Sequence, residues 1–451
     1  MMLNWRVLLP AALLLSACAT APKAPAVKPQ ASGNKDVAEY RRHLEEAYAA
    51  VVEHETTPVD APEVDVEAAA SIEIPEHRTI RSALDYFTTG LRDSIQTSLV
   101  RSARYKKLID KALSERRLPK GLAYLPVIES AYLPTLTSRA GAHGIWQFMP
   151  ETAREYGLRV DWWVDERADP AASTLAAAEY LEDLYRQFGD WPLALAAYNA
   201  GPGRISRALS RTGARNFWEL IDMAAIPRET RAYVPTFFAT LLIASDPDSF
   251  GFRLGDPQDA DEAEVAIDGP VSLKYIAEVA SVDDGRLQEL NPALRRGIVP
   301  PGTVRVRVPS GAVEVIAERG TTLKNDDPNI AVCSFRLRRG DTIAELARAI
   351  GTKASTIAEM NGLASPSRLR TGDSIYLPVR ARELGSLLSH WKDKKYFYAV
   401  QKGDTIYSIA KRHNLSVTEL RDLNDLRKSA RLQHGQRLRV APPRTVTAGG
   451  G

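Results

Sequence analysis

The chain has 451 residues, 44% of them hydrophobic and 25% charged, and its net charge is +3. This length predicts several domains, and this composition excludes a disordered chain, while so small a net charge by itself indicates no class of partner. Two cysteines are too few for a dense disulfide framework, and neither has a second Cys or His at zinc-ligand spacing, so we expect no metal and no cofactor.

The N-terminus has the pattern of an export signal that ends in a lipidation site. Arg6 provides a short positive segment, and residues 7–15 form an apolar run that is too short to span a bilayer comfortably. Leu15-Ser16-Ala17-Cys18 resembles a lipobox, in which the cysteine receives a lipid after cleavage. We therefore predict a lipoprotein signal at residues 1–18 with lipid on Cys18. The alternative is an ordinary secretory signal.

Residues 19–75 are predicted to form a tether with one short helix. Residues 19–34 are rich in Ala, Pro, Lys and Ser, which is typical of a linker rather than a core. Apolar residues between Tyr40 and Val51 recur at helical spacing, so the short helix is placed there.

Residues 76–250 are predicted to form a predominantly helical domain. Their apolar residues recur at helical spacing, as in the stripe formed by Leu84, Phe87, Leu91 and Ile95, and strand patterns are sparse. The length of this segment suits one hydrophobic core.

One carboxyl group in this domain has an unusual setting. Glu129 is the single acidic residue in an apolar helical stretch that begins near Leu122. Burial among apolar neighbours would raise its pKa, so that it could hold a proton near neutral pH and donate it. Periodicity alone leaves open a carboxylate that is paired to an arginine or faces water.

The residues that follow Glu129 match a known pattern. Three motifs occur in order: Glu129-Ser130, then Ser138 with Gly141, Gly144, Gln147, Met149 and Pro150 in the spacing Gly-x-x-Gly-x-x-Gln-x-Met-Pro; Ala197-Tyr198-Asn199-Ala200-Gly201; and Tyr233-Val234-Pro235. They resemble the catalytic motifs of the lytic transglycosylases of the lysozyme-like superfamily. Ile145-Trp146 departs from the Leu-Met of many relatives, although the membrane-bound D-type members also tend to have Trp there.

The resemblance implies a lysozyme-like α+β domain and a reaction. Glu129 would protonate the glycosidic oxygen of the β-1,4 bond between N-acetylmuramic acid and N-acetylglucosamine. The carboxylate would then accept the proton of the muramic C6 hydroxyl as that oxygen attacks C1, giving a 1,6-anhydro sugar. It also assigns a set of residues to the glycan cleft: Ser130, Ser138, Gly144, Gln147, Met149, Tyr198, Asn199 and Tyr233. By this assignment Tyr198 hydrogen-bonds at or near Glu129, Tyr233 borders the cleft, and Gly144 lets a sugar ring approach; for the two tyrosines, core packing is the alternative.

A second catalytic carboxylate is not evident. Ordinary glycosidases use two carboxylates that flank the bond. The acidic residues nearest in sequence (Asp161, Asp165, Glu166 and Asp169) cluster around Trp162-Trp163 and Pro170, which indicates a polar loop with an Asp-Pro turn. A single carboxyl suffices if the substrate supplies the nucleophile, because intramolecular attack is efficient.

The C-terminal part repeats one pattern three times. Each copy has an Ala, an Asn fourteen positions later and a Gly eleven positions after that: Ala277/Asn291/Gly302, Ala347/Asn361/Gly372 and Ala410/Asn424/Gly435. The second and third copies share Gly-Asp-Thr-Ile before the first helix, at 340–343 and 403–406, and such Asp or Thr residues cap helices. Each unit is predicted as strand, helix, helix, strand, and the units resemble the βααβ LysM domain.

This resemblance predicts repeats at residues 263–312, 331–380 and 395–442. The first is degenerate, since Pro270-Val271-Ser272 replaces Gly-Asp-Thr. The other two imply glycan contacts by four loop residues: Asp341, Thr342, Asp404 and Thr405. Residues 331–442 contain 21 Lys/Arg and 10 Asp/Glu, which suggests a polyanionic partner. The chain carries an export signal and lacks a nucleic-acid motif, so a cell wall is favoured over nucleic acid.

Together these patterns predict a multidomain lyase of peptidoglycan, in which an α-helical lysozyme-like catalytic domain is followed by small βααβ modules that bind the wall. We expect a monomer that is anchored by lipid in a Gram-negative bacterium. The residue after Cys18 is Ala19 rather than Asp, so we expect the anchor at the periplasmic face of the outer membrane. The alternatives are a lysozyme-type hydrolase and a catalytically inactive peptidoglycan-binding lipoprotein.

Overall fold

The computed structural model describes residues 72–256, 261–328, 330–337, 341–363, 369–370, 372–413, 415–427 and 430–440, with Glu46 and Ala49. Cys18, the predicted signal and nearly all of the predicted tether lie outside the described residues. The chain divides into two compact units: Met1–Gly269 with Ile276–Thr321, and Pro270–Tyr275 with Thr322–Gly451. Within the described part, no helix has the length and apolar character needed to cross a membrane.

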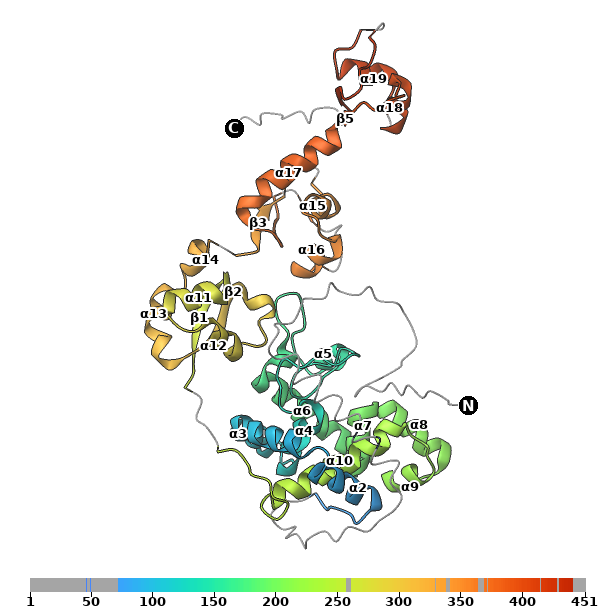
Figure 1. The fold of residues 1–451 in the computed structure, drawn as a ribbon, viewed down its shortest axis with the longest axis vertical. Coiled ribbons are helices and arrows are strands. Elements are labelled where there is room, and N and C mark those ends of the chain that lie inside the picture. Colours follow the sequence, from blue (N-terminus) through green and yellow to red (C-terminus); the bar gives the residue numbers. More distant parts are fainter. Residues whose placement is uncertain are drawn as a thin grey trace. The chain divides into compact units, whose positions relative to one another are not determined.

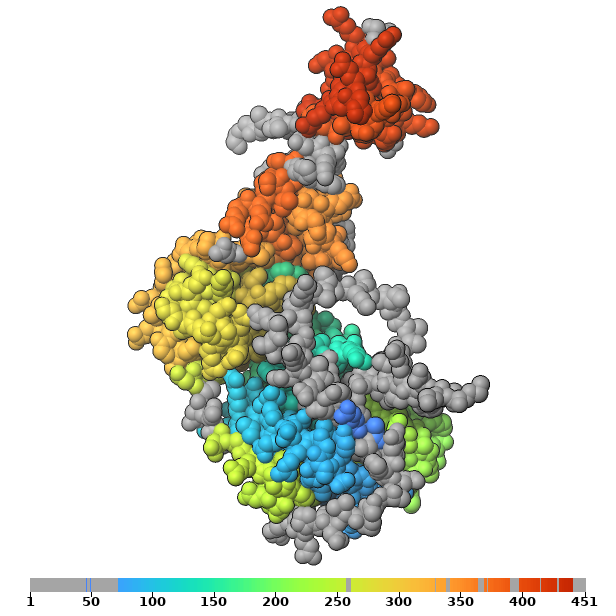
Figure 2. All heavy atoms as spheres, in the orientation of Figure 1, coloured from blue at the N-terminus to red at the C-terminus, as the bar shows by residue number. Residues whose placement is uncertain are grey.

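The first unit begins with a helical domain that has one continuous core (Figure 1). Its helices are α2 (Arg78–Thr88), α3 (Arg92–Glu115), α4 (Leu125–Ser130), α5 (Pro150–Glu155), α6 (Pro170–Phe188), α7 (Trp191–Ala200), α8 (Pro202–Thr212), α9 (Phe217–Asp222) and α10 (Arg228–Ser245). Helices α2 and α3, in blue, lie side by side on the face shown in Figure 2. The predicted helical domain is confirmed. Its β structure, among the described residues, is limited to isolated bridges such as Thr137 with His143 and His143 with Phe148.

Helix α10 is the centre of this domain. It contacts α2, α4 and α7, and nearly all of its side chains are buried. Two of these neighbours, α4 and α7, carry predicted site residues. The ends of α7 are set by local sequence. Asp190 caps α7 by accepting a hydrogen bond from the Leu193 N–H, and Gly201, with φ of 86°, ends it. The packing of α10 therefore brings the motifs at residues 129, 198 and 233 to one place.

The three repeats have the predicted order of strand, helix, helix, strand. The first contains β1 (Ala263–Ser272), α11 (Leu273–Ala280), α12 (Asp284–Leu290) and β2 (Ile298–Val308); the second β3 (Cys333–Arg336), α15 (Ile343–Ala349), α16 (Ala354–Met360) and β4 (Ser374–Leu377); the third β5 (Phe397–Ala399), α18 (Ile406–Arg412), α19 (Val417–Asp422) and β6 (Arg437–Arg439). In each repeat the two strands pair, antiparallel in the second and third. Three further helices were not predicted: α13 (Val313–Arg319), α14 (Leu323–Asp326) and α17 (Ala381–Tyr396).

The fixed spacing in the repeats has a physical cause. In the third repeat, Asn424 Nδ2 donates to the carbonyls of Leu420 (2.8 Å) and Arg439 (2.7 Å), and its Oδ1 accepts from the Arg439 N–H. The side chain thus joins the end of α19 to β6. The same three bonds are made by Asn291 and by Asn361 in the other repeats. The repeated Ala is buried in the first helix, and the repeated Gly takes a positive φ, before the last strand in the second and third repeats and within β2 in the first.

We expect Asn424→Ala to destabilise the third repeat by about 2–3 kcal/mol, because the backbone groups of Arg439 and Leu420 lose their partner. Hydrogen exchange of the full chain would show faster exchange at residues 437–439. Thr418→Ala, an exposed change on α19, is the control. Equal exchange in the two variants would contradict this role for the asparagine.

Candidate active site

Glu129 lies on a short, buried helix. Helix α4 has Pro126 in its first turn, and the residue that follows its last residue, Ala131, has a left-handed φ of 51°. Leu125, Val127 and Ile128 are at most 1% exposed, so the helix is held by the core on several sides. Glu129 itself is only half-buried, and it lines a small cavity.

The environment of Glu129 favours its protonated form. Its pKa is raised from 4.5 to about 8. Burial raises the pKa most, a hydrogen bond donated by the Tyr233 hydroxyl to Oε1 lowers it, and the charge of nearby Glu229 raises it. Because burial is the largest of these effects, the carboxyl carries its proton at neutral pH. This is the state expected from the apolar sequence around it, rather than an arginine pair or a solvated carboxylate.

A cavity of about 140 Å³ opens beside Glu129. Five of the predicted site residues line it: Glu129, Gln147, Met149, Tyr198 and Asn199. Glu129 is the only acidic residue among the described residues in this lining. Asn199 is held from α10, since its Oδ1 accepts a hydrogen bond of 2.9 Å from the Thr230 hydroxyl.

The two tyrosines differ in their hydrogen-bond partners. The hydroxyl of Tyr233 donates to Glu129, whereas the hydroxyl of Tyr198 donates to the Trp146 carbonyl at 2.7 Å. The hydrogen bond expected from Tyr198 at or near Glu129 goes to the Trp146 carbonyl, and not to Glu129 itself. Tyr198 lies in the cavity wall and supports the loop that carries Gln147, and Tyr233 is the residue that holds the Glu129 carboxyl.

Three other predicted residues shape the loop that follows α4. The Ser130 hydroxyl is fully buried and donates to the Ile145 carbonyl at 2.8 Å, and Ser138 Oγ accepts from the Ala142 N–H at 3.0 Å. Gly144 has φ of 86°, and a Cβ there would meet the Arg167 carbonyl oxygen at 1.7 Å. The close approach at Gly144 is thus to protein backbone, not to a sugar as expected from the sequence.

A buried ion pair fixes both ends of that loop, and the sequence did not indicate it. Arg167 binds Asp165 through two hydrogen bonds of 2.8 Å, and its Nη1 donates to the carbonyls of Gly141 (2.7 Å) and Phe148 (2.9 Å). Both side chains are below 10% exposed. Burial alone would raise the pKa of Asp165, but the bonds and charge of Arg167 lower it below its ordinary value. The expected polar loop at residues 161–169 contains this pair.

The same segment docks the first repeat. The Asp165 N–H donates to the Ala293 carbonyl at 2.9 Å, and Arg307 forms an ion pair of 2.7 Å with Asp169. Arg296 donates to the Trp162 carbonyl, and its guanidinium lies 4.3 Å from the centre of the Trp162 ring. Residues 161–169 therefore join the loop that carries Gln147 to a repeat that lacks the Gly-Asp-Thr turn.

In the other repeats the predicted glycan residues have structural partners. Thr342 and Thr405 cap α15 and α18 by accepting hydrogen bonds from the N–H groups of Glu345 and Ser408. The Asp404 side chain is 7% exposed and accepts from the Tyr398 hydroxyl and the Gln401 N–H. The predicted capping is confirmed. Thr342, Asp404 and Thr405 thus shape the turns that begin the helices.

Comparison with known proteins gives three family matches. The Transglycosylase SLT domain matches residues 107–221, the LysM domain matches residues 336–378 and 398–441, and the Lytic transglycosylase MltD, LysM-like domain matches residues 262–325.

The chain is also similar to individual proteins. It is 32% identical over 381 residues to membrane-bound lytic murein transglycosylase D of Escherichia coli, covering 81% of this chain and 82% of that protein. Soluble lytic murein transglycosylase of Escherichia coli is 33% identical over 146 residues, 30% of this chain and 22% of the relative. Among solved structures, an inactive variant of lytic transglycosylase Slt from Pseudomonas aeruginosa aligns with 28% identity over 31% of this chain and 24% of its own, with a TM-score of 0.28.

Proposed function

The chain belongs to the membrane-bound lytic murein transglycosylase D family, and from this premise we propose that Glu129 is the acid and base of its reaction. The protein is a peptidoglycan lytic transglycosylase, a lyase, with an SLT domain and LysM domains that bind peptidoglycan. The predictions of family, fold class and reaction are confirmed. The assignment of individual residues is our proposal.

One observation supports the assignment of Glu129: burial raises the pKa of this carboxyl, to about 8, and no other described residue of the cavity lining is acidic. In the first step its proton passes to the glycosidic oxygen as the bond from C1 to that oxygen breaks. In the second, the Glu129 carboxylate takes the proton of the muramic C6 hydroxyl, whose oxygen bonds to C1. The Tyr233 hydroxyl stabilises the carboxylate between the two steps, because it donates to Oε1.

The other site residues support this chemistry. Gln147, Met149, Tyr198 and Asn199 contact the glycan from the cavity wall. Ser130, Ser138 and Gly144 act indirectly, by holding the loop that carries Gln147. In the repeats, the turns at Asp341-Thr342 and Asp404-Thr405 form the edges of glycan sites, with the second turn held by Tyr398.

Two further features belong to the proposal, the lipid anchor that sets the location of the enzyme and the repeats that bind the wall. It is an enzyme of the Gram-negative envelope. We further propose a monomer that is lipid-anchored through Cys18 at the periplasmic face of the outer membrane. The repeats at residues 331–380 and 395–442 hold the wall, and most of the repeat at 263–312 lies in the same compact unit as the catalytic domain. Deleting residues 332–442 should abolish binding to purified sacculi; unchanged binding would remove the proposed role of these repeats.

The masses of the products test the reaction. Purified peptidoglycan is digested with the chain lacking residues 1–18. We expect muropeptides lighter than the hydrolytic ones by the mass of one water, since the C6 hydroxyl replaces water as nucleophile. Hydrolytic masses would support the lysozyme alternative, and binding to sacculi without any product would support the inactive one.

The pH dependence reports the state of Glu129. With a pKa of about 8, kcat/KM should be constant near neutral pH and fall about tenfold per pH unit well above pH 8, as the proton to be donated is lost. Tyr233→Phe removes a hydrogen bond that lowers this pKa, so the alkaline limb should move to higher pH. A pH–rate profile of both proteins measures the shift. A limb that stays in place or moves down would contradict the assignment.

A further inference from the structure

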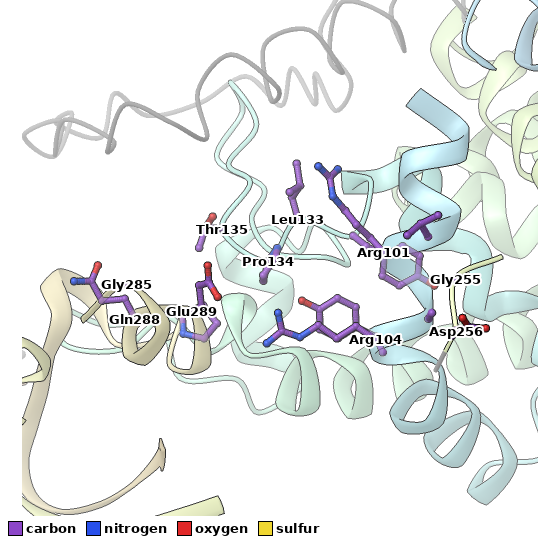
Figure 3. Close-up of a pocket in the computed structure, with 15 residues that line it drawn as sticks. Arg101, Arg104, Leu133, Pro134, Thr135, Gly255, Asp256, Gly285, Gln288 and Glu289 are labelled. Atoms are coloured by element: carbon purple, nitrogen blue, oxygen red, sulfur yellow. The ribbon is translucent and has the colours of Figure 1, made fainter. Parts of the chain in front are cut away.

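A second cavity, of about 790 Å³, lies in the first unit and is not used by the mechanism above. Its walls come from α3, from the loop after α4, from residues 255–256 and from α12 of the first repeat (Figure 3). We propose that this cavity binds the stem peptide that peptidoglycan carries on its muramic acid residues. The proposal rests on the proposed function. It assigns a binding site to the peptide part of the substrate, which the glycan cleft does not contact.

The cavity wall carries three polar groups whose hydrogen-bonding capacity is open to a ligand. Tyr105 lines it with a side chain that is 9% exposed, and its hydroxyl makes no hydrogen bond to another described residue. Within the described part of the chain, Arg101, which is half-buried, and Arg104, which is exposed, also make no hydrogen bond and no ion pair. The Tyr105 hydroxyl and the two guanidinium groups thus face the cavity without a hydrogen-bond partner among the described residues. Together they are suited to a polar ligand.

The arrangement of these groups indicates the chemistry of the ligand. The ring of Tyr105 is stacked on that of Tyr132 at 5.8 Å, which fixes the direction of its hydroxyl, and the Arg104 guanidinium lies 5.8 Å from the Tyr105 ring centre. Figure 3 shows Arg104 extending toward Glu289 and Arg101 beside Leu133. Guanidinium groups bind carboxylates with paired hydrogen bonds.

The acidic residues of the cavity complete a bipolar site. Glu289 on α12 and Asp256 line the cavity together with the arginines, and Glu289 is 65% exposed with a weak ion pair of 3.5 Å to Arg286. They suit an ammonium group. A peptide with free carboxylates and an amine fits this combination, and the stem peptides of peptidoglycan carry both.

A loop connects this cavity to the residues beside Glu129. The loop Tyr132–Thr135 lines it, and the next residue, Leu136, accepts hydrogen bonds of 3.1 Å from the Gly144 N–H and from Gln147 Nε2. One short loop therefore touches both the cavity and the wall of the glycan cleft. An extended peptide spans about 3.3 Å per residue, so a stem of four residues reaches about 13 Å from its sugar.

The test is the preference of the enzyme between two substrates. We would measure kcat/KM on glycan strands that carry stem peptides and on strands from which an amidase has removed them. The ratio of the two values should fall about tenfold in the double variant Arg101→Gln/Arg104→Gln. The control, Arg81→Gln/Lys111→Gln, removes the same charge from exposed positions and should keep the ratio. An unchanged ratio in the first variant, or an equal fall in the control, would overturn the proposal.

Two further measurements separate this proposal from the proposed function. Calorimetry with a free tetrapeptide stem and the folded chain detects the site without catalysis, and the binding should be lost in the double variant. Glu289→Gln should weaken binding of the free stem but not of a stem whose side-chain amine is acetylated. Binding that is unaffected by these changes would overturn the site even if the enzyme is active. Absence of anhydro products with intact stem binding would instead overturn the proposed function alone.

Discussion

Glu129→Gln should abolish the release of anhydro-muropeptides, with a loss of about 10³-fold or more. The amide has nearly the shape of the carboxyl but can neither donate the proton in the first step nor accept one in the second. Turbidity loss of a sacculus suspension, together with product analysis, measures the effect. Glu155→Gln, an exposed change on α5, is the matched control and should keep full activity. Full activity of Glu129→Gln would contradict the catalytic assignment.

The same variant should keep its fold. Because the folded-state pKa of Glu129 is about 8 and the unfolded value is 4.5, the folded chain holds a proton that the unfolded chain releases between these pH values. Folding stability from this group therefore falls as pH rises from about 4.5 to about 8. The amide of Glu129→Gln does not titrate, so the variant should gain stability relative to the parent as pH rises from about 5 to about 8. Thermal unfolding at both pH values separates a lost proton donor from a lost fold.

Arg167→Ala should lower both stability and activity. The change leaves the Asp165 carboxylate buried without its partner and frees the carbonyls of Gly141 and Phe148. Breaking a buried ion pair from one side lowers the free energy of unfolding by about 3–5 kcal/mol. The loop with Gln147 should lose its position, so activity should fall under conditions in which the variant is still folded.

Urea unfolding and the rate of wall digestion measure these two effects. Arg186→Ala is the control: its side chain is 66% exposed, and its ion pairs with Glu182 and Asp183 should contribute at most about 1 kcal/mol. Arg167→Lys keeps the charge but cannot form the same paired hydrogen bonds, so it should recover only part of the stability. A loss in Arg167→Ala no larger than in the control would contradict the role given to the buried pair.

The carboxyl with a raised pKa could be predicted from sequence because its signal is local. Glu129 is one acidic residue in an apolar helix, and the motif around it has a fixed spacing. The same holds for the repeats, whose Asn424 and its two counterparts were found by spacing alone. Their task, joining a helix to a strand, could not be inferred because the strand partner lies fifteen residues away in the chain.

The errors concern contacts between distant segments. The hydrogen bond to Glu129 comes from a residue 104 positions away, and only the packing of α10 against α4 decides that Tyr233 rather than Tyr198 donates it. Asp165 was predicted only as part of a polar loop, because the carbonyls that its partner Arg167 also binds, at residues 141 and 148, are not adjacent in sequence. Gly144 matched a motif, but the reason for the glycine is the Arg167 backbone.

The central claim is that Glu129 works alone and that the substrate supplies the nucleophile. The most direct test is to digest purified peptidoglycan in water enriched with the heavy oxygen isotope and to determine the masses of the released muropeptides. Our account predicts anhydro ends that contain no heavy oxygen, because no water enters the product. Muramic ends that carry the heavy isotope would show water as the nucleophile, and would require a second catalytic carboxylate beside Glu129.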